Sequence, residues 1–463
     1  MTAALARLLN LVCTCMLVAA VSVAPHARAI TPPEVDLATD IAPPDGDPAP
    51  ALDMKQNTVC ATSAVLADSQ FGVIPASAVF GVSELHKFAR GDGQVVAVID
   101  SGVQPVSRLP RLRGGGDYIM SGDGLSDCDH HGTLIAGIIA AAPSPNDGFV
   151  GVAPGAEIVS IRQTSAAFTE DHPPQGYSDA DRSAANLMAL AKAIVHAVNL
   201  GATVINLSVT ACVDAGSPVD TRALAGALYY AAVARDAVIV TAAGNTGGQT
   251  CQPNPGYDPA NPADRRNWDG VRSVSLPSYF SNLLLSVGGT TLTGDPYVNS
   301  MPGPWVGAAA PSMNIVSLDP TEPRPGALTN AALVKGAPIP LNGTSYGAAY
   351  VSGLAALIRE KYPHLSARQV INRILSTAHT PAEGLTNTLG AGPIDAVAAL
   401  TADVPKGDIV AAGVPSVAAP EPTPPPPPDN TARDVALGTF LAAAVILTVI
   451  AIVVFALRRS DNA

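Results

Sequence analysis

Basic residues are scarce in this sequence of 463 residues. Lys and Arg total 26 against 38 Asp and Glu, which gives a formal net charge of −12 at pH 7 and a pI near 5.0. Proteins that bind nucleic acid gather basic side chains into patches that meet the phosphate backbone, and no basic block occurs in this chain. The composition therefore argues against a nucleic-acid partner.

The chain also lacks a regular spacing of metal ligands. The segment EDHPP places two acidic residues beside one histidine, which is more typical of a solvated turn than of a metal site. No cluster of oxygen ligands suited to calcium is evident, and no internal repeat is visible. We therefore assign neither a metal nor a cofactor.

The N-terminus does contain an export signal. Arg7 precedes an apolar run at residues 8–23, and Ala27 and Ala29 then provide the small-x-small pattern of a cleavage site. An uncleaved anchor is the alternative, but the well-formed cleavage site favours a signal peptide at residues 1–29.

A second apolar segment lies close to the C-terminus. Residues 435–457 carry no charge and would form a helix of about 34 Å, enough to span a hydrocarbon core of about 30 Å. Arg458 and Arg459 follow directly, and positive charge favours the cytoplasmic side. We predict a transmembrane helix at 435–457, a cytoplasmic tail at 458–463, and a body held outside the cytoplasm at the cell membrane.

Six cysteines are present, and Cys13 and Cys15 leave with the signal peptide. The other four form an even set in an exported chain, which favours two disulfides. From the residues alone, three connectivities are open. The four cysteines are Cys60, Cys128, Cys212 and Cys251.

Two segments rich in proline flank the body. Residues 30–85 open with a polar stretch of proline and aspartate that cannot build a core, so we predict an extended arm. Residues 404–434 contain consecutive prolines and predict a stiff spacer in the polyproline II conformation. A recognition segment for a partner is the alternative for this linker.

The body, residues 86–403, alternates two kinds of apolar segment. Continuous apolar runs predict buried strands, and runs of helical period between them predict helices. Repeated β-α-β units imply an α/β fold in which a mainly parallel sheet lies between layers of helices. The predicted strands are 94–100, 156–162, 203–209 and 237–245, and the predicted helices are 132–141, 185–201 and 221–234.

Ser345 lies among small residues just before an apolar helical pattern, in LNGTSYGAAYVSG. The simpler interpretation is an N-cap, because a serine hydroxyl accepts from the free N–H groups of a first helical turn. The alternative is a nucleophile, because the same N–H groups point to where an oxyanion would form. A nucleophile requires a base and an acid elsewhere in the chain.

Candidates for these roles follow the predicted strands. Asp100 and Asn245 each come directly after a buried run, and His130 and His131 precede an apolar helix. Each residue alone is more often structural. Because ligand sites of parallel sheets lie at the carboxyl ends of the strands, these side chains and Ser345 are expected at one edge.

The blocks that carry these residues resemble the active-site blocks of subtilisin-like serine proteases, in the order Asp, His, Ser. They are VIDSGV (98–103), HGTLIAGIIA (131–140), AAGN (242–245) and NGTSYGAAYVSG (342–353). The resemblance implies a serine endopeptidase with a subtilisin-like three-layer fold.

By the same resemblance, Ser345 is the nucleophile, His131 the general base and Asp100 the residue that orients its imidazole. Asn245 would donate to the oxyanion. His130 is left as structural. The segment Ser208, Val209 and Thr210 matches the strand that pairs with an extended peptide or protein substrate, although it lacks the family's glycine pair.

The arm, protease body, proline-rich linker and C-terminal anchor together resemble the mycosins. These are the membrane-anchored subtilisin-like proteases of actinobacterial type VII secretion systems. The resemblance implies processing of secreted substrates and a place in the secretion membrane complex. The alternative is a scaffold of that complex with little or no protease activity.

The cysteine placement is also similar to that of the mycosins. Cys212 and Cys251 follow strands expected to be neighbours, which brings them within reach of a disulfide. The expected pairs are therefore Cys212–Cys251 and Cys60–Cys128, the latter fastening the arm beside the His131 loop.

Overall fold

The computed structural model describes residues 30–217, 219–247, 251–321, 326–409 and 411. The predicted signal peptide, transmembrane helix, cytoplasmic tail and most of the linker lie outside the described residues. Within the described ranges, no helix is both long and apolar enough to cross a membrane.

The main sheet of the described chain has seven strands, all paired in parallel. Residues of this sheet are mostly buried on both faces, as the continuous apolar runs predict. From one edge to the other, the strands are β12 (Val306–Pro311), β11 (Leu285–Thr290), β9 (Val238–Ala242), β7 (Val204–Leu207), β3 (Val95–Asp100), β5 (Glu157–Arg162) and β4 (Leu112–Asp117).

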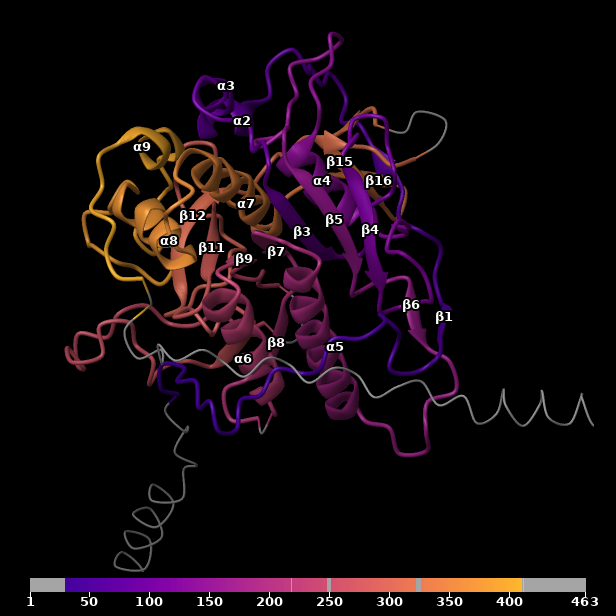
Figure 1. Cartoon of the computed structure of the whole chain (residues 1–463), viewed down its shortest axis with the longest axis vertical. Coiled ribbons are helices and arrows are strands. Elements are labelled where there is room, and N and C mark those ends of the chain that lie inside the picture. Colours follow the sequence, from indigo (N-terminus) through magenta and orange to yellow (C-terminus); the bar gives the residue numbers. More distant parts are fainter. Residues whose placement is uncertain (1–29, 218, 248–250, 322–325, 410, 412–463) are drawn as a thin grey trace, which may run out of the picture. The chain divides into compact units, whose positions relative to one another are not determined.

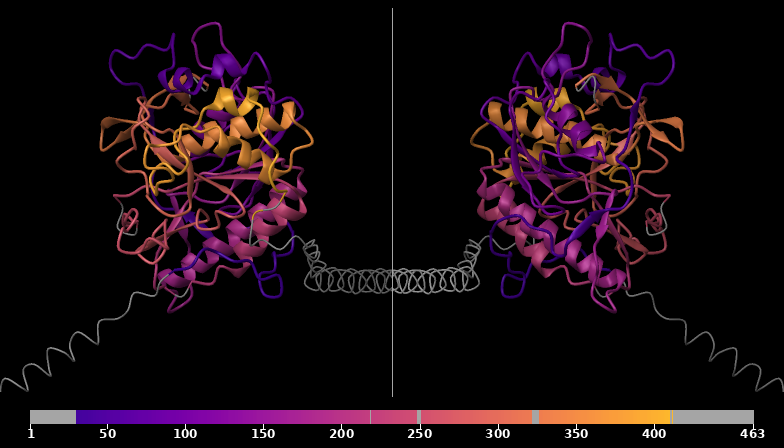
Figure 2. Two further views of the ribbon diagram at one scale, coloured as in Figure 1. Left: turned by 90° about the vertical axis from the view of Figure 1, so that its left-hand side faces the viewer. Right: turned by 90° about the vertical axis from the view of Figure 1, so that its right-hand side faces the viewer.

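Helices cover both faces of this sheet (Figures 1 and 2), which confirms the predicted α/β architecture. The first face carries α4 (His131–Ala140), α7 (Thr344–Lys361) and α8 (Ala367–Ser376), with α2 (Pro75–Phe80), α3 (Val82–Leu85) and α9 (Ala396–Thr401) beside them. The second carries α5 (Asp179–Asn199), α6 (Arg222–Tyr229) and a π-helical turn, η1 (Tyr230–Ala234).

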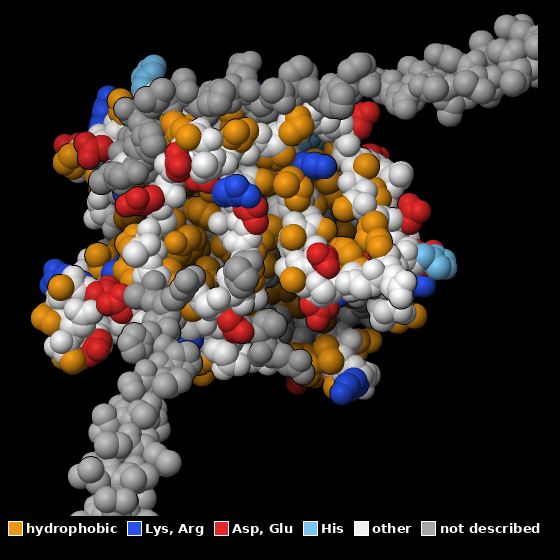
Figure 3. Space-filling view, turned by 90° about the horizontal axis from the view of Figure 1, so that it is seen from below, with side chains coloured by type: hydrophobic (Ala, Val, Ile, Leu, Met, Phe, Trp, Pro, Cys, Tyr) orange, Lys and Arg blue, Asp and Glu red, His pale blue; other side chains and the backbone are white. Residues whose placement is uncertain are grey.

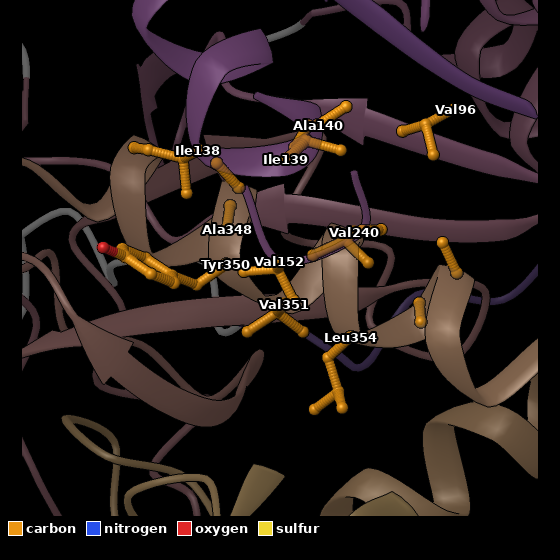
Figure 4. Packing of buried hydrophobic residues seen from close by; sticks show 14 of the residues in the cluster. Val96, Ile138, Ile139, Ala140, Val152, Val240, Ala348, Tyr350, Val351 and Leu354 are labelled. Carbon is orange, nitrogen blue, oxygen red and sulfur yellow. The ribbon is translucent and has the colours of Figure 1, made fainter. Parts of the chain in front are cut away.

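Strand β3 shows how alternation along a strand divides the two cores. Val96 and Val98 face the core that contains α4 and α7, while Ala97 and Ile99 face the core that contains α5 and α6. Figure 4 shows the first core, where side chains of α4, such as Ile138, lie close to those of α7. The end of β3 is thereby fixed from both sides.

Four smaller antiparallel sheets accompany the main sheet in the described part of the chain. They are β1 (Met54–Gln56) with β6 (Phe168–Glu170), β8 (Ala211–Asp214) with β10 (Ser273–Leu276), β13 (Ser317–Leu318) with β14 (Leu328–Thr329), and the three-stranded β2 (Ser63–Ala64), β15 (Ala331–Val334) and β16 (Ala337–Pro340). Two of these, β1–β6 and β2–β15, join the arm to the body.

The arm passes α6 and α5 and then runs beside β6, as its indigo trace shows in Figure 1. Asp45 accepts from His196 of α5 at 2.8 Å. The last part of residues 30–85 departs from an extended chain, because α2 and α3 form there and bury Phe80 and Leu85. As short helices, these segments place their apolar side chains on one face, and burying that face stabilises the fold.

Helix α5 begins at Asp179, six residues before the predicted start at 185. Ser178 and Asp181 form a capping box at this end, so a segment that resembles a polar insertion in the sequence forms the first turn of the helix.

Basic side chains lie singly among apolar and acidic ones on the face seen from below in Figure 3, which is turned from the view of Figure 1.

Candidate active site

The predicted site residues lie at the carboxyl ends of the parallel strands, on the side of α4 and α7. Asp100 is the last residue of β3, His131 the first of α4, and Ser345 the second of α7. Asn245 follows β9. Residues separated by up to 245 positions in the sequence are therefore brought together by the sheet and two helix starts.

A continuous chain of hydrogen bonds joins three of these side chains. His131 Nδ1 lies 2.7 Å from Asp100 Oδ1, and His131 Nε2 lies 3.0 Å from Ser345 Oγ. Asp100 also accepts from the backbone N–H of Ser101 at 2.7 Å. With a proton on Nδ1, the imidazole donates to Asp100 and can accept the serine proton at Nε2.

The environment of His131 favours its cation. Burial alone would lower the pKa of His131, but the charge and hydrogen bond of Asp100 outweigh burial, so the pKa lies above its ordinary value of 6.5. Asp127 and Asp129 add to this effect. The imidazole is 31% exposed while the Asp100 side chain is 1% exposed, so the pair opens toward solvent on the histidine side.

Ser345 is not the N-cap of its helix, so the simpler interpretation of this serine is wrong. The N-cap of α7 is Gly343, no side chain caps this end, and Ser345 lies within the first turn. Its hydroxyl is therefore free to meet His131. A methyl group on Gly343 would lie 3.2 Å from Ser345 Oγ and 3.7 Å from Asn245 Nδ2, so the missing side chain leaves space between these two atoms.

The amide of Asn245 is held in one orientation. Its Oδ1 accepts from the backbone N–H of Thr344 at 3.1 Å and lies 3.4 Å from Thr344 Oγ1. The Nδ2 group, which carries both amide protons, is thus directed toward the space beside Ser345. A donor in this position can bind an oxygen that becomes negative during attack by the serine.

Ser208, Val209 and Thr210 connect β7 to β8 at the same edge. Ser208 is buried, and its hydroxyl donates to the backbone carbonyl of Ser345 at 3.2 Å. Val209 and Thr210 are half-buried and make no backbone hydrogen bond to another described residue. Their backbone groups are available to pair with an extended peptide.

Two histidines that adjoin in sequence have separate surroundings. His130 is the N-cap of α4, with a left-handed φ of 64°, and its Nδ1 lies 3.0 Å from Ser63 Oγ of the arm. Burial lowers the pKa of His130. His130 therefore contacts the arm, and only His131 reaches the serine.

Asp127 was not among the candidates from the sequence. It is 6% exposed and accepts hydrogen bonds from Ser101, the residue after Asp100, and from Thr133, two residues after His131. Its place four residues before His131 in DCDHHGT was the available signal, but acidic residues in such a segment are usually solvated.

Both disulfides of the described chain lie beside the site. Cys60–Cys128 fastens the arm to the segment that precedes His131, and Cys212–Cys251 links β8 to the segment that follows β9. Among the described residues, no group of three His, Cys, Asp or Glu side chains could hold a metal ion.

Comparison with known proteins shows the family of this chain. A family model described as the subtilase family matches residues 91–392. Mycosin-3 of Mycobacterium tuberculosis is 46% identical over 451 residues, which cover 94% of this chain and 94% of that protein.

Two solved structures are also similar. The crystal structure of MycP1 from Mycobacterium smegmatis aligns with a TM-score of 0.79 and 45% identity, covering 82% of this chain and 98% of that one. A chain from an intact ESX-5 inner membrane complex aligns with a TM-score of 0.78 and 44% identity, covering 91% of this chain and 99% of that one. The chain described here belongs to the subtilase family of serine endopeptidases and, within it, to the mycosins.

Proposed function

We propose that this chain is a membrane-anchored endopeptidase that acts outside the cytoplasmic membrane and cleaves substrates of a type VII secretion system. The observation that carries the proposal is a pair of hydrogen bonds: His131 Nδ1 donates to Asp100 at 2.7 Å, and the Ser345 hydroxyl donates to His131 Nε2 at 3.0 Å. A serine bonded to an imidazole that is itself bonded to a buried carboxylate is equipped for acyl transfer.

In this mechanism Ser345 Oγ attacks the scissile carbonyl carbon while its proton passes to His131 Nε2. The carbonyl oxygen becomes negative, and Asn245 Nδ2 and the first-turn backbone N–H of Ser345 donate to it. His131 then gives the proton to the leaving amine, which leaves an acyl-enzyme on Ser345. Water, deprotonated by His131, releases the acyl group and restores the hydroxyl.

Asp100 keeps the imidazole in the tautomer that presents Nε2 to the serine, and its charge stabilises the imidazolium. The substrate would lie as an added strand along Ser208, Val209 and Thr210. The half-buried backbone of Val209 and Thr210, which pairs with no described residue, supports this placement.

The location follows from the two ends of the chain. Residues 1–29 would be removed on export, residues 435–457 would cross the membrane, and 404–434 would space the body from it. The remaining boundaries are an arm at 30–85, a peptidase domain at 86–403 and a cytoplasmic tail at 458–463. A chain similar to this one, at 44% identity, belongs to an ESX-5 inner membrane complex. We infer that this chain also joins a type VII membrane complex.

Labelling with a fluorophosphonate probe tests the proposal, because the probe reacts only with an activated serine. The wild-type chain should label, while Ser345→Ala and His131→Ala should not. His130→Ala is the matched control, since that histidine contacts the arm and lies outside the relay. Absence of labelling in the folded wild type would count against an active peptidase.

The second candidate is a scaffold of the secretion complex with little activity. The extensive arm, joined to the body by two strand pairings and a disulfide, favours a role in assembly beside catalysis. Ser345→Ala separates the two. If the variant assembles with its complex but no longer cleaves, both roles reside in this chain; if secretion is also unaffected, the scaffold role predominates.

A further inference from the structure

A second buried carboxylate lies behind the catalytic relay. Asp127 belongs to the connection between β4 and α4, is 6% exposed, and forms no ion pair with a basic side chain of the described chain. A buried carboxylate without a cation is costly unless hydrogen bonds stabilise it. The mechanism above assigns no role to Asp127. A buried carboxylate at this position therefore needs another physical explanation.

Three donors surround the carboxylate. Ser101 Oγ donates to Oδ1 at 2.8 Å, and the backbone N–H and hydroxyl of Thr133 both donate to Oδ2, at 2.8 and 2.6 Å. Each hydroxyl also accepts a backbone N–H, from Gly132 at 2.9 Å for Ser101 and from Gln104 at 2.9 Å for Thr133. The hydroxyl protons are thereby directed to Asp127, an arrangement that suits its ionised form.

These bonds join the two halves of the relay through the backbone. Ser101 follows Asp100 and donates its own N–H to Asp100 Oδ1 at 2.7 Å. Gly132 and Thr133 follow His131 in the first turn of α4. Asp127 therefore binds both the end of β3 and the start of α4, the two elements that carry the acid and the base.

We propose that Asp127 is a positioning residue of the peptidase reaction, which fixes the end of β3 against the start of α4 and places a second negative charge behind His131. It touches no reacting atom. Its effect passes through Ser101 and Thr133 to the backbone on which Asp100 and His131 stand, and directly through its charge.

The electrostatics agree with this geometry. Burial raises the pKa of Asp127 to about 7, and the charge of Asp100 adds to this rise, while the bonds from Thr133 and Ser101 oppose it. The acidic groups that act on His131 are Asp100, Asp127 and Asp129, and each raises the pKa of the imidazole. An imidazolium formed during attack by the serine is thus stabilised by more than the carboxylate it touches.

The test is the pH profile of peptide hydrolysis for the full chain and its Asp127→Asn variant. The variant removes the charge and replaces one acceptor oxygen by a donor. We expect kcat to fall roughly 10- to 100-fold, the scale of a small misplacement of catalytic groups, with KM changed less than twofold. The acid limb of kcat/KM should move to lower pH, because His131 loses the stabilising charge that Asp127 supplies while it is ionised, at and above about pH 7.

Ser101→Ala separates position from charge, because it keeps the carboxylate but cuts its link to Gly132. We expect a loss of kcat with a smaller shift of the acid limb, and where Asp127→Asn does not fold, this variant decides the matter. Asp123→Asn is the matched control. It lies in the same connection, is exposed, and bonds only the backbone N–H of Leu125 through its side chain.

A purely structural role predicts a different pattern. In that case, Asp127→Asn and Ser101→Ala would lower the stability of the chain while the folded fraction kept its kcat and its acid limb. That outcome, or equal effects of Asp123→Asn and Asp127→Asn, would overturn the proposal.

Discussion

Removing the disulfide between Cys60 and Cys128 should destabilise the chain and also impair catalysis. The bridge joins residues separated by 68 positions. In the chain-entropy model, closing a loop of this length disfavours the unfolded state by about 4 kcal/mol at 25 °C. The double variant Cys60→Ser/Cys128→Ser should therefore lose up to roughly that much free energy of unfolding.

The second disulfide provides a control of nearly equal strength. Cys212 and Cys251 are separated by 39 positions, and the same model gives a cost only about 0.5 kcal/mol smaller. The two double variants should thus be similar in stability, as measured by equilibrium unfolding in urea. Any difference between their activities must come from where the bridges lie.

The bridges lie beside different parts of the site. Cys128 adjoins Asp127, accepts a backbone hydrogen bond from Ala61 at 2.8 Å, and stands three residues before His131. Cys212 follows the segment that we assign to substrate binding. We expect loss of the first bridge to lower kcat and loss of the second to raise KM.

The two kinetic constants are measured from hydrolysis of one peptide by both variants. The assay is run without urea, at a temperature where each variant is folded. Equal kcat in the Cys60→Ser/Cys128→Ser variant and the wild type would refute the reasoning that the arm holds the segment before His131 in position for catalysis. A stability loss below about 1 kcal/mol would refute the estimate from loop length.

Three further predictions concern the relay and its surroundings. Asn245→Ala should lower kcat about 10²- to 10³-fold with little change in KM, as measured by steady-state kinetics, because a donor to the oxyanion is lost. Gly343→Ala should lower labelling by a fluorophosphonate with little effect on thermal stability, because its methyl group would lie 3.2 Å from Ser345 Oγ. Asp100→Asn should lower kcat by about 10⁴-fold and move the titration of His131, followed by NMR, to lower pH. The raised pKa of His131 also means that its stabilisation is complete below pH 6.5 and is lost as pH rises through the folded-state value, so this variant should flatten stability in that range.

Much of the fold could be predicted because buried parallel strands have unbroken apolar runs in the sequence. The runs at 94–100 and 156–162 appear as β3 and β5, within one residue at each end. The start of α5 could not be found in this way, because its first turn is polar and is defined by the capping box of Ser178 rather than by apolar period.

The roles in the relay depend on contacts that no single segment reveals. Asp100 and His131 could be proposed as catalytic residues because they lie beside apolar runs. The order of the four sequence blocks that resemble subtilisin-like proteases then assigned their roles. The opposite held for Asp127, which resembles a solvated turn residue until the structure shows it enclosed by Ser101 and Thr133. Burial of a polar residue depends on tertiary packing, which sequence pattern alone does not encode.

The arm illustrates the same difference between composition and packing. Its polar opening predicts no core, yet its later part buries Ile74, Phe80 and Leu85 in the core that carries α4 and α7. Its middle part reaches the histidine segment through Ser63, Ala61 and the Cys60–Cys128 bridge. A segment that shares the core and contacts His130 and Cys128, close to the general base, acts as part of the peptidase fold. The arm and the body should therefore unfold as one unit.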